Sequence, residues 1–270
     1  MVDVLLSPDN RFTLDSLMAK RDMVEDRLST DMKTRTRRVL SWLERARQEE
    51  DDQDAAFVFY WIAFEAVYGE WTREGQAQRA NFKKLFEKAT AADTKNTIRD
   101  EVLDNLGDTI LEVVANPYIF EPFWDYYNGN SDSDDEWQNL LISDVERVSV
   151  RLENGDAVEP LAAAFERLCV VRNQLFRGEA TWNRYVNRSQ IEDGTEILAF
   201  VVLALADLML DKPEAFDHPS RYPSVESDTA ETVEDVADYA IAVNVHRRIR
   251  DGQERVYSSA EVRKELGLDD

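Results

Sequence analysis

The stretch FVFYWIAFEAVY, Phe57–Tyr68, decides the fold class, because as a helix it is apolar around nearly its whole circumference. Such a helix belongs at the centre of a helical core, and Gly69 is its expected C-cap. Acids at Asp52 and Asp54 precede it and complement the positive end of the helix dipole. Glu65 is the one charge inside the stretch. It needs a cationic partner or a cleft, because an unpaired buried charge is costly.

Helical periodicity extends outward from this stretch and predicts an all-α protein. Only 9 glycines and 7 prolines interrupt the 270 residues, and the alternation typical of strands is nearly absent. Asn187 and Gln190 resemble a helix N-cap and its reciprocal partner. A polar loop is expected over residues 128–136. The expected helices cover residues 14–48, 57–68, 78–89, 93–106, 109–114, 137–152, 158–176 and 191–210.

The composition describes an acidic chain that can bury a real core. With 43% hydrophobic and 10% aromatic residues it is not disordered, and no run approaches the roughly 18 apolar residues of a membrane span. The formal net charge is −23, and only eight of the 32 basic residues are lysine. This balance is typical of a halophilic, high-salt cytoplasm, and an ordinary acidic protein is the alternative. At molar salt the Debye length is about 3 Å, so the charge does not exclude an RNA ligand.

Cysteine and histidine are too scarce for disulfide or zinc chemistry. A single cysteine, Cys169, allows no intramolecular disulfide and suits a reducing compartment. The two histidines, His218 and His246, argue against a zinc site. The first residues show no secretory pattern. We therefore expect a cytoplasmic protein with no metal and no other cofactor.

Basic residues gather in one place, between residues 33 and 47. One interpretation is a solvated helix face whose charges are balanced by nearby acids. The other is a surface that contacts the RNA backbone, with Arg35 and Arg38 as the phosphate-binding candidates.

The second informative stretch is VVRNQLFRGEATW, Val170–Trp182, at the end of an apolar helical run. It holds Arg172, Asn173 and Arg177 just before a glycine. The tryptophans Trp61, Trp124 and Trp182 are expected to be core anchors, although Trp182 would also suit base stacking. Cys169, one turn earlier, is expected to be a packed thiol.

The longer string LCVVRNQLFRGEATWNRYVNRSQIEDGTEIL, residues 168–198, resembles the signature of HEPN domains, whose pattern is RN-x-x-x-HG. The stretch FVFYWIAFEAVYG is similar to the first long core helix of that family. The resemblance covers roughly residues 30–211. It implies an all-α bundle, a homodimer with the motif in a cleft, and a metal-independent endoribonuclease of a toxin–antitoxin or phage-defence system.

Carried onto this chain, the motif gives Arg172 as the cation that stabilises phosphate charge, and Asn173 as the residue that positions it. The histidine that would move protons is replaced by Arg177, whose guanidinium binds phosphate but cannot act as a general base. Gly178 matches the pattern, whereas Glu179 replaces a second glycine. This departure puts full catalytic activity in doubt.

Three explanations for Arg177 stay open. The protein is a degenerate member that keeps an anion-binding cleft, a detoxified variant, or an enzyme that relies on arginines alone at a low rate. In a purely structural role, Arg172 forms an ion pair with Glu65. The alternative function is a non-catalytic helical module that binds RNA, a nucleotide or a protein.

The composition changes beyond residue 211. We expect an HEPN-like domain over residues 1–211, a proline-containing linker over 212–230 and a helical appendage over 231–270. The end of the chain is similar to small bacterial antitoxins, with a helix, a turn and the string SSAEVRKELGL. This resemblance implies that the cleft meets an antitoxin or the chain's own tail. In an ordinary helix, Ser258 or Ser259 is the cap and Gly267 the end. No membrane or DNA partner is expected.

Overall fold

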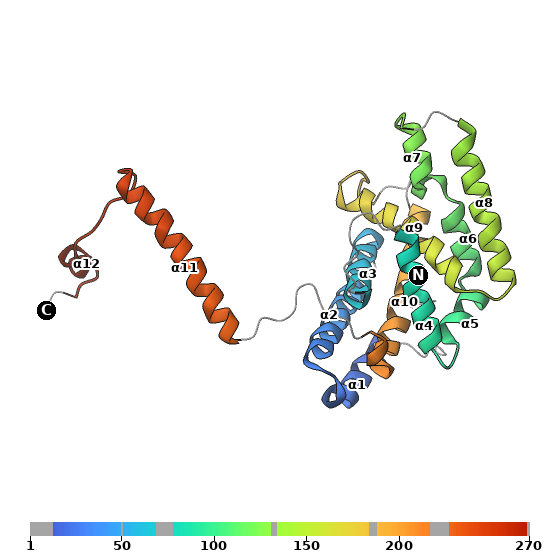
Figure 1. The fold of residues 1–270 in the computed structure, drawn as a ribbon, viewed down its shortest axis with the longest axis horizontal. Coiled ribbons are helices and arrows are strands. Elements are labelled where there is room, and N and C mark those ends of the chain that lie inside the picture. The colour runs from blue at the N-terminus through green and yellow to red at the C-terminus, as the bar shows by residue number, and fades with distance from the viewer. Residues whose placement is uncertain are drawn as a thin grey trace. The chain divides into compact units, whose positions relative to one another are not determined.

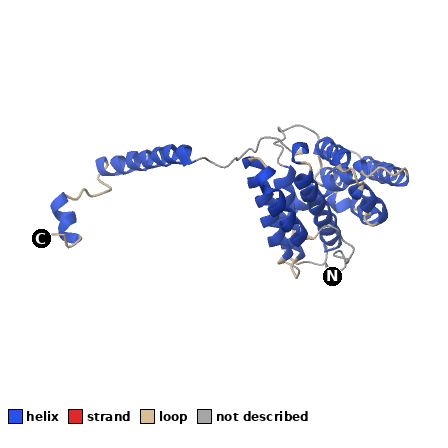
Figure 2. Ribbon diagram, turned by 90° about the horizontal axis from the view of Figure 1, so that it is seen from below, coloured by secondary structure: helices blue, strands red, loops and turns tan. Residues whose placement is uncertain are grey.

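The computed structural model describes residues 13–49, 51–68, 78–130, 134–183, 188–216 and 227–268. The chain divides into two compact units, residues 1–222 and 223–270, called unit 1 and unit 2 below. Every regular element in these described ranges is a helix, and they contain no strand (Figure 2). The expectation of an all-α protein is confirmed.

Unit 1 is a bundle of α-helices with short 3-10 turns (Figure 1). The α-helices are α1 (Leu14–Val24), α2 (Thr30–Arg47), α3 (Gln53–Tyr68), α4 (Gln78–Ala92), α5 (Thr97–Asp104), α6 (Gly107–Ala115), α7 (Glu121–Tyr127), α8 (Asp134–Glu153), α9 (Val158–Phe176) and α10 (Arg188–Asp211). The 3-10 turns are η2 (Glu25–Arg27), η3 (Pro117–Ile119) and η5 (Pro213–Ala215).

Helix α3 is central, as its sequence predicts. It packs against both α2 and α10, and Phe57, Trp61 and Phe64 are buried. Asp52 caps its first turn, since Oδ1 accepts a hydrogen bond from the Ala55 amide at 3.0 Å. Asp52 thus caps the start of the helix, and the apolar run fills the core.

Phe165 of α9 joins the helices that face α3. Its ring centroid lies 4.6 Å from that of Phe64, 5.7 Å from that of Phe82 and 5.0 Å from that of Phe86. Because Phe82 and Phe86 belong to α4, one aromatic ring ties α9 to both α3 and α4. Gly194 lets α10 lie close to α9, since a Cβ at this position would lie 2.7 Å from a Leu168 methyl group.

The first expected helix, residues 14–48, is wrong as a single element. It breaks after Val24 into a 3-10 turn, and α2 restarts where the Ser29 hydroxyl accepts from the Met32 amide at 3.3 Å. A serine cap offers the backbone an alternative to a continuing helix. The capped break lets α1 pack against both α2 and α10.

Other boundaries shift for similarly local reasons. Helix α8 begins at Asp134, inside the expected polar loop, whereas α9 has the expected bounds. Gln190 is buried and accepts a hydrogen bond from the Asn116 side chain at 3.2 Å, so it links α10 to the end of α6. Gly69 and Asn187 lie outside the described residues, so neither expected cap is described.

Unit 2 consists of α11 (Ser227–Arg250) and the short α12 (Ser259–Glu265). Ser258 caps α12 in a reciprocal capping box with Glu261, and Gly267 follows with a φ of 65°, as the sequence predicts. Residues 217–226, most of the expected linker, lie outside the described residues. None of the helices in the described ranges has the length and hydrophobicity needed to cross a membrane.

Candidate functional site

The motif residues lie at the C-terminal end of α9, where a glycine ends the helix. Gly178 has a φ of 71°, in the left-handed region that favours glycine. Its amide donates to the Leu175 carbonyl at 3.1 Å, and the Glu179 amide donates to the Gln174 carbonyl at 2.8 Å. This pair of hydrogen bonds is a Schellman motif. It reverses the chain directly after Arg177, the C-cap residue.

Arg172 points toward α3. Its guanidinium lies 5.1 Å from the Trp61 ring centroid and 3.6 Å from Glu65 Oε1. The expected contact between Arg172 and Glu65 is therefore present, although half of the Glu65 side chain (49%) is exposed. Asn173 Oδ1 accepts from Arg172 Nε at 3.2 Å and from Nη2 at 3.0 Å. Asn173 thus holds the Arg172 guanidinium in place through two hydrogen bonds.

Opposing effects act on the pKa of the Glu65 carboxyl group. Burial by the surrounding helices raises its pKa, while the charge of Arg172 and a hydrogen bond from Trp61 Nε1 at 3.0 Å lower it. The net shift is upward. Glu65 is tolerated in an apolar helix because half of its side chain is exposed and Arg172 lies beside it.

A cleft with a volume of about 630 Å³ opens on another side of the α9 end. One wall comes from the segment that holds η3 and α7, and the other from the last turns of α9 and the residues after it. The lining residues are Tyr118, Glu121, Trp124, Asn128, Val170, Asn173, Gln174, Arg177, Glu179 and Thr181. The motif is thus divided, since Asn173 and Arg177 line the cleft and the Arg172 guanidinium contacts α3.

The cleft walls are fastened to each other at one backbone carbonyl. Gln174 Nε2 and Trp124 Nε1 each donate to the Tyr118 carbonyl oxygen at 2.9 Å. The Trp124 ring also packs edge-on against Phe123, with centroids 5.1 Å apart. These contacts fix the aromatic wall relative to α9.

Arg177 is the exposed cation of the cleft. Among the described residues, no ion pair or side-chain hydrogen bond is formed by its guanidinium, which leaves all its donors available to a ligand. Glu121 and Glu179 supply carboxylates, and Asn128, Asn173 and Gln174 supply amides. The arrangement can bind an anion through one guanidinium and stack a planar group on Tyr118 or Trp124.

The remaining predicted site residues lie elsewhere in unit 1. Trp182 is exposed, not a core anchor, and its Nε1 donates to Asp52 Oδ2 at 2.8 Å. Arg35 is buried and donates to the Phe216 carbonyl and, at 4.0 Å, to Met32 Sδ. The burial of Arg35 does not suit a phosphate contact made from solvent. Arg38, on the same helix, is partly buried.

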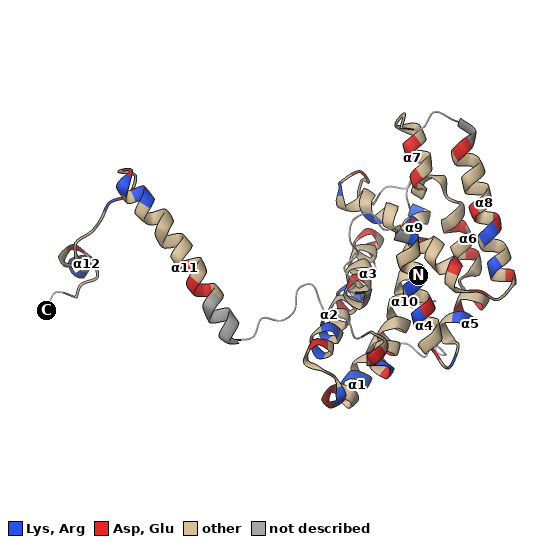
Figure 3. Ribbon diagram, viewed as in Figure 1, with Lys and Arg blue, Asp and Glu red and all other residues tan. Residues whose placement is uncertain are grey.

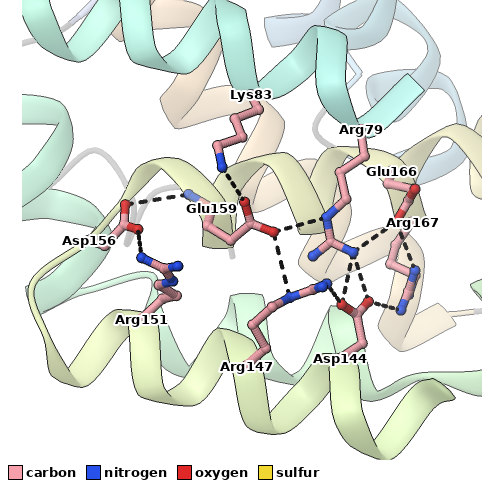
Figure 4. Close-up of polar contacts among 9 residues, drawn as sticks. All are labelled: Arg79, Lys83, Asp144, Arg147, Arg151, Asp156, Glu159, Glu166 and Arg167. Carbon is pink, nitrogen blue, oxygen red and sulfur yellow. Dashed lines mark hydrogen bonds and ion pairs between the residues drawn. The ribbon is translucent and has the colours of Figure 1, made fainter. Parts of the chain in front are cut away.

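A buried ionic cluster on α9 was missed by the sequence analysis (Figure 4). Asp144 of α8 accepts from Arg167 at 2.6 Å, from Arg79 at 2.8 Å and from Arg147. Arg167 is 2% exposed, and its guanidinium also lies 4.1 Å from the Phe120 ring centroid. Burial lowers the pKa of Arg167, and the charge of Asp144 opposes that shift. Three guanidinium groups around one carboxylate fasten α4, α8 and α9 together.

Cys169 and the acidic residues offer no further chemistry at this end of α9. Cys169 is buried, and burial raises the pKa of its thiol, so it is a packed side chain as expected. Within the described part of the chain, histidine, cysteine and acidic residues do not gather into a group that could hold a metal ion.

The cleft residues that sequence reasoning missed lie on both walls. Tyr118 and Trp124 belong to the aromatic stretch NPYIFEPFWDYY, from which the sequence analysis singled out only Trp124, as a core anchor. Gln174 and Glu179 lie inside the quoted motif. Their nearness in sequence to Asn173 and Arg177 could have indicated that they line the same site. Comparison of the chain with protein-family models, curated proteins and solved structures found no match. The fold and site therefore define an all-α protein with a polar and aromatic cleft at a helix end.

Proposed function

We propose that unit 1 is an HEPN-like, ribonuclease-related protein whose cleft binds single-stranded RNA and cleaves it poorly. The observation that carries the proposal is the presence of Asn173 and Arg177 on the same cleft as Tyr118 and Trp124. A guanidinium is suited to phosphate oxygens, and aromatic rings are suited to unstacked bases. The setting, a toxin–antitoxin or phage-defence system, follows from the resemblance alone.

Poor cleavage follows from the groups that line the cleft. Attack of a ribose 2′-hydroxyl on the neighbouring phosphate needs one group to accept a proton and another to donate one. Arg177 stands where the family pattern has histidine and stays protonated. Glu121 and Glu179 are the acids at hand, and their negative charge repels a phosphate. Binding without efficient turnover is the consequence.

The alternative function is a non-catalytic module that binds RNA, a nucleotide or a protein in the same cleft. The observation that favours it is also Arg177, since an exposed guanidinium beside amides and aromatic rings serves recognition without any chemistry. RNA cleavage and RNA binding, measured separately, distinguish the two functions.

Binding is tested with a fluorescent single-stranded RNA over a series of salt concentrations. We expect Arg177→Ala to weaken binding about tenfold or more, since a charge-assisted hydrogen bond contributes about 1.5–3 kcal/mol. The matched control is Arg37→Ala, which removes an exposed arginine of α2 outside the cleft. Equal losses in the two variants would mean that the RNA does not bind in the cleft.

Cleavage is tested with the same RNA in the presence of a metal chelator. We expect Arg177→His to gain cleavage over the unchanged chain, because imidazole titrates near neutral pH. The gain should disappear in Arg177→His combined with Asn173→Ala. An inert histidine variant that still binds RNA would favour the non-catalytic module, and a chain that binds no RNA would reject both RNA functions.

A further inference from the structure

The cleft of unit 1 carries two carboxylates that its proposed phosphate ligand cannot use. Glu121 and Glu179 line the cleft, and neither side chain forms an ion pair or a hydrogen bond with any other residue that the structure describes. A phosphate oxygen and a carboxylate oxygen are both acceptors, so they do not bind each other. These carboxylates instead suit a part of the ligand that carries N–H donors.

The two walls of the cleft differ in charge. Both charged residues of α7, Glu121 and Asp125, are acids (Figure 3), and the lining residues of that wall include no cation. Arg177 lies on the opposite wall, at the end of α9. A phosphate is therefore attracted to the α9 wall and repelled from the α7 wall. The α7 wall is left for the uncharged part of a nucleotide, which is the base.

Glu121 lies beside the aromatic side chains of its wall. It precedes Trp124 by three residues on α7, and residues at this spacing are neighbours on a helix surface. Tyr118, in the turn η3 that precedes α7, has 55% of its surface exposed. A base that stacks on this wall thus lies near a carboxylate that can accept hydrogen bonds from its edge.

A carboxylate distinguishes guanine from the other bases by the pattern of donors. It only accepts hydrogen bonds, and its two oxygens suit two parallel N–H groups. The Watson–Crick edge of guanine offers such a pair, N1–H and the N2 amino group. Adenine and cytosine have one amino group beside a ring nitrogen that accepts, and uracil has N3–H between two carbonyl oxygens. Because those acceptors repel a carboxylate, it favours guanine.

We propose that the cleft selects guanine, with the base stacked on Tyr118 or Trp124 and the Glu121 carboxylate bound to N1–H and the N2 amino group. The neighbouring phosphate of the strand binds Arg177 on the opposite wall. This inference rests on the proposed function, because it names the base that the RNA presents to the cleft. Glu121 determines specificity, whereas Glu179, two residues from Arg177, weakens phosphate binding without contacting the base.

Binding of short fluorescent oligouridine RNAs that differ at one central base tests the selection with the full chain. The central base is guanine, adenine, cytosine or hypoxanthine, which keeps N1–H and lacks the N2 amino group. We expect guanine to bind about tenfold more tightly than adenine or cytosine, as a bidentate contact to a base can provide. Hypoxanthine should bind several-fold more weakly than guanine.

The Glu121→Gln variant should bind all four RNAs with nearly equal affinity, because a neutral amide offers one acceptor oxygen in place of two. The matched control is Asp125→Asn, which removes an exposed acid of the same helix outside the cleft and should keep the preference for guanine. Glu179→Gln should strengthen the binding of every RNA by a similar factor and also keep the preference.

Equal affinities of the unchanged chain for all four RNAs would overturn the selection of guanine and leave the proposed function intact. A preference for guanine that survives in Glu121→Gln would overturn the proposal, and so would a preference that is lost in Glu179→Gln or Asp125→Asn. The absence of binding to any of the RNAs would overturn the proposed function, and the selection of guanine with it.

Discussion

Helix α9 and its C-cap carry three arginines, Arg167, Arg172 and Arg177, at intervals of five residues, and their exposure increases along the chain. Arg167 is buried in an ionic cluster around Asp144. Arg172 is partly exposed against Trp61 and Glu65, and Arg177 is exposed on the cleft. Five residues rotate a helix by about 140°, so successive arginines leave on different sides. One helix therefore uses the same side chain for folding at one end and offers it to a ligand at the other.

The largest effect is expected at the buried end. Asp144→Ala leaves three guanidinium groups without their shared carboxylate, and removing one member of a buried ionic set costs about 3–5 kcal/mol. Denaturant unfolding of the full chain measures the loss. Glu146→Ala, which removes an exposed acid of the same helix, is the control and should change stability by less than about 0.5 kcal/mol. Similar losses in both would show that the cluster does not stabilise the fold.

An intermediate effect is expected at Arg172. Arg172→Ala removes a cation–π contact of about 0.5–1 kcal/mol and an exposed ion pair of about 0–1 kcal/mol, so the free energy of unfolding should fall by about 1–2 kcal/mol. A double-mutant cycle with Glu65→Gln separates the two contributions. A coupling energy well above that of an exposed pair would mean that Arg172 stabilises the fold as strongly as the buried cluster does, rather than to an intermediate extent.

A pH-dependent effect is expected at Asp193, a carboxyl group whose charged neighbours are acids. Burial, followed by Glu112, Glu196 and Glu192, raises its pKa from 3.8 to about 6. The stability that the protonated form contributes is complete below about pH 4. It is lost as the pH rises through about 6. Relative to the unchanged chain, Asp193→Asn should therefore be more stable at pH 7 than at pH 4.

Unfolding measured at several pH values between these limits checks the Asp193 prediction. Glu153→Gln, an exposed acid on α8, is the control and should show a flat difference across the same range. A flat difference for Asp193→Asn too would mean that its acidic neighbours do not act on it in the folded protein.

The smallest effect on stability is expected at the exposed end. Arg177→Ala should change the free energy of unfolding by no more than about 0.5 kcal/mol, since the side chain is exposed at a helix end. Together with the expected loss of RNA binding, this would separate recognition from folding within one helix. A destabilisation as large as that of Arg172→Ala would show that Arg177 has a structural partner.

The sequence predicts the helices of unit 1 best where burial is continuous. Helix α9 has its expected bounds, and α3 extends its expected range by one turn at the start, because apolar periodicity and capping residues are local signals. The break after Val24 was missed, since one serine cap competes weakly with a long periodic pattern. Propensity alone does not decide such a competition, because the packing of α1 contributes to it.

The site was only half predictable for the same reason. Asn173 and Arg177 come from one motif, and their shared face follows from helical spacing. The opposite wall depends on Tyr118, which meets Gln174 across 56 residues of chain, and no local pattern records that distance. The pairing of Asp144 with Arg167 also spans residues far apart in sequence, across 23 residues of chain. The sequence thus shows which polar residues need partners, while only the packed helices show which partners they have.

The turn at Gly178 gives one residue of the motif a structural role. Its left-handed backbone and the two hydrogen bonds around it are required to end α9, whatever the cleft binds. A variant that lost every function of the cleft would still need a glycine at this place, because a side chain there would strain the exit from the helix. Gly178 is therefore explained by the architecture of the helix end, and Arg177 just before it is the position where a change in function should be sought.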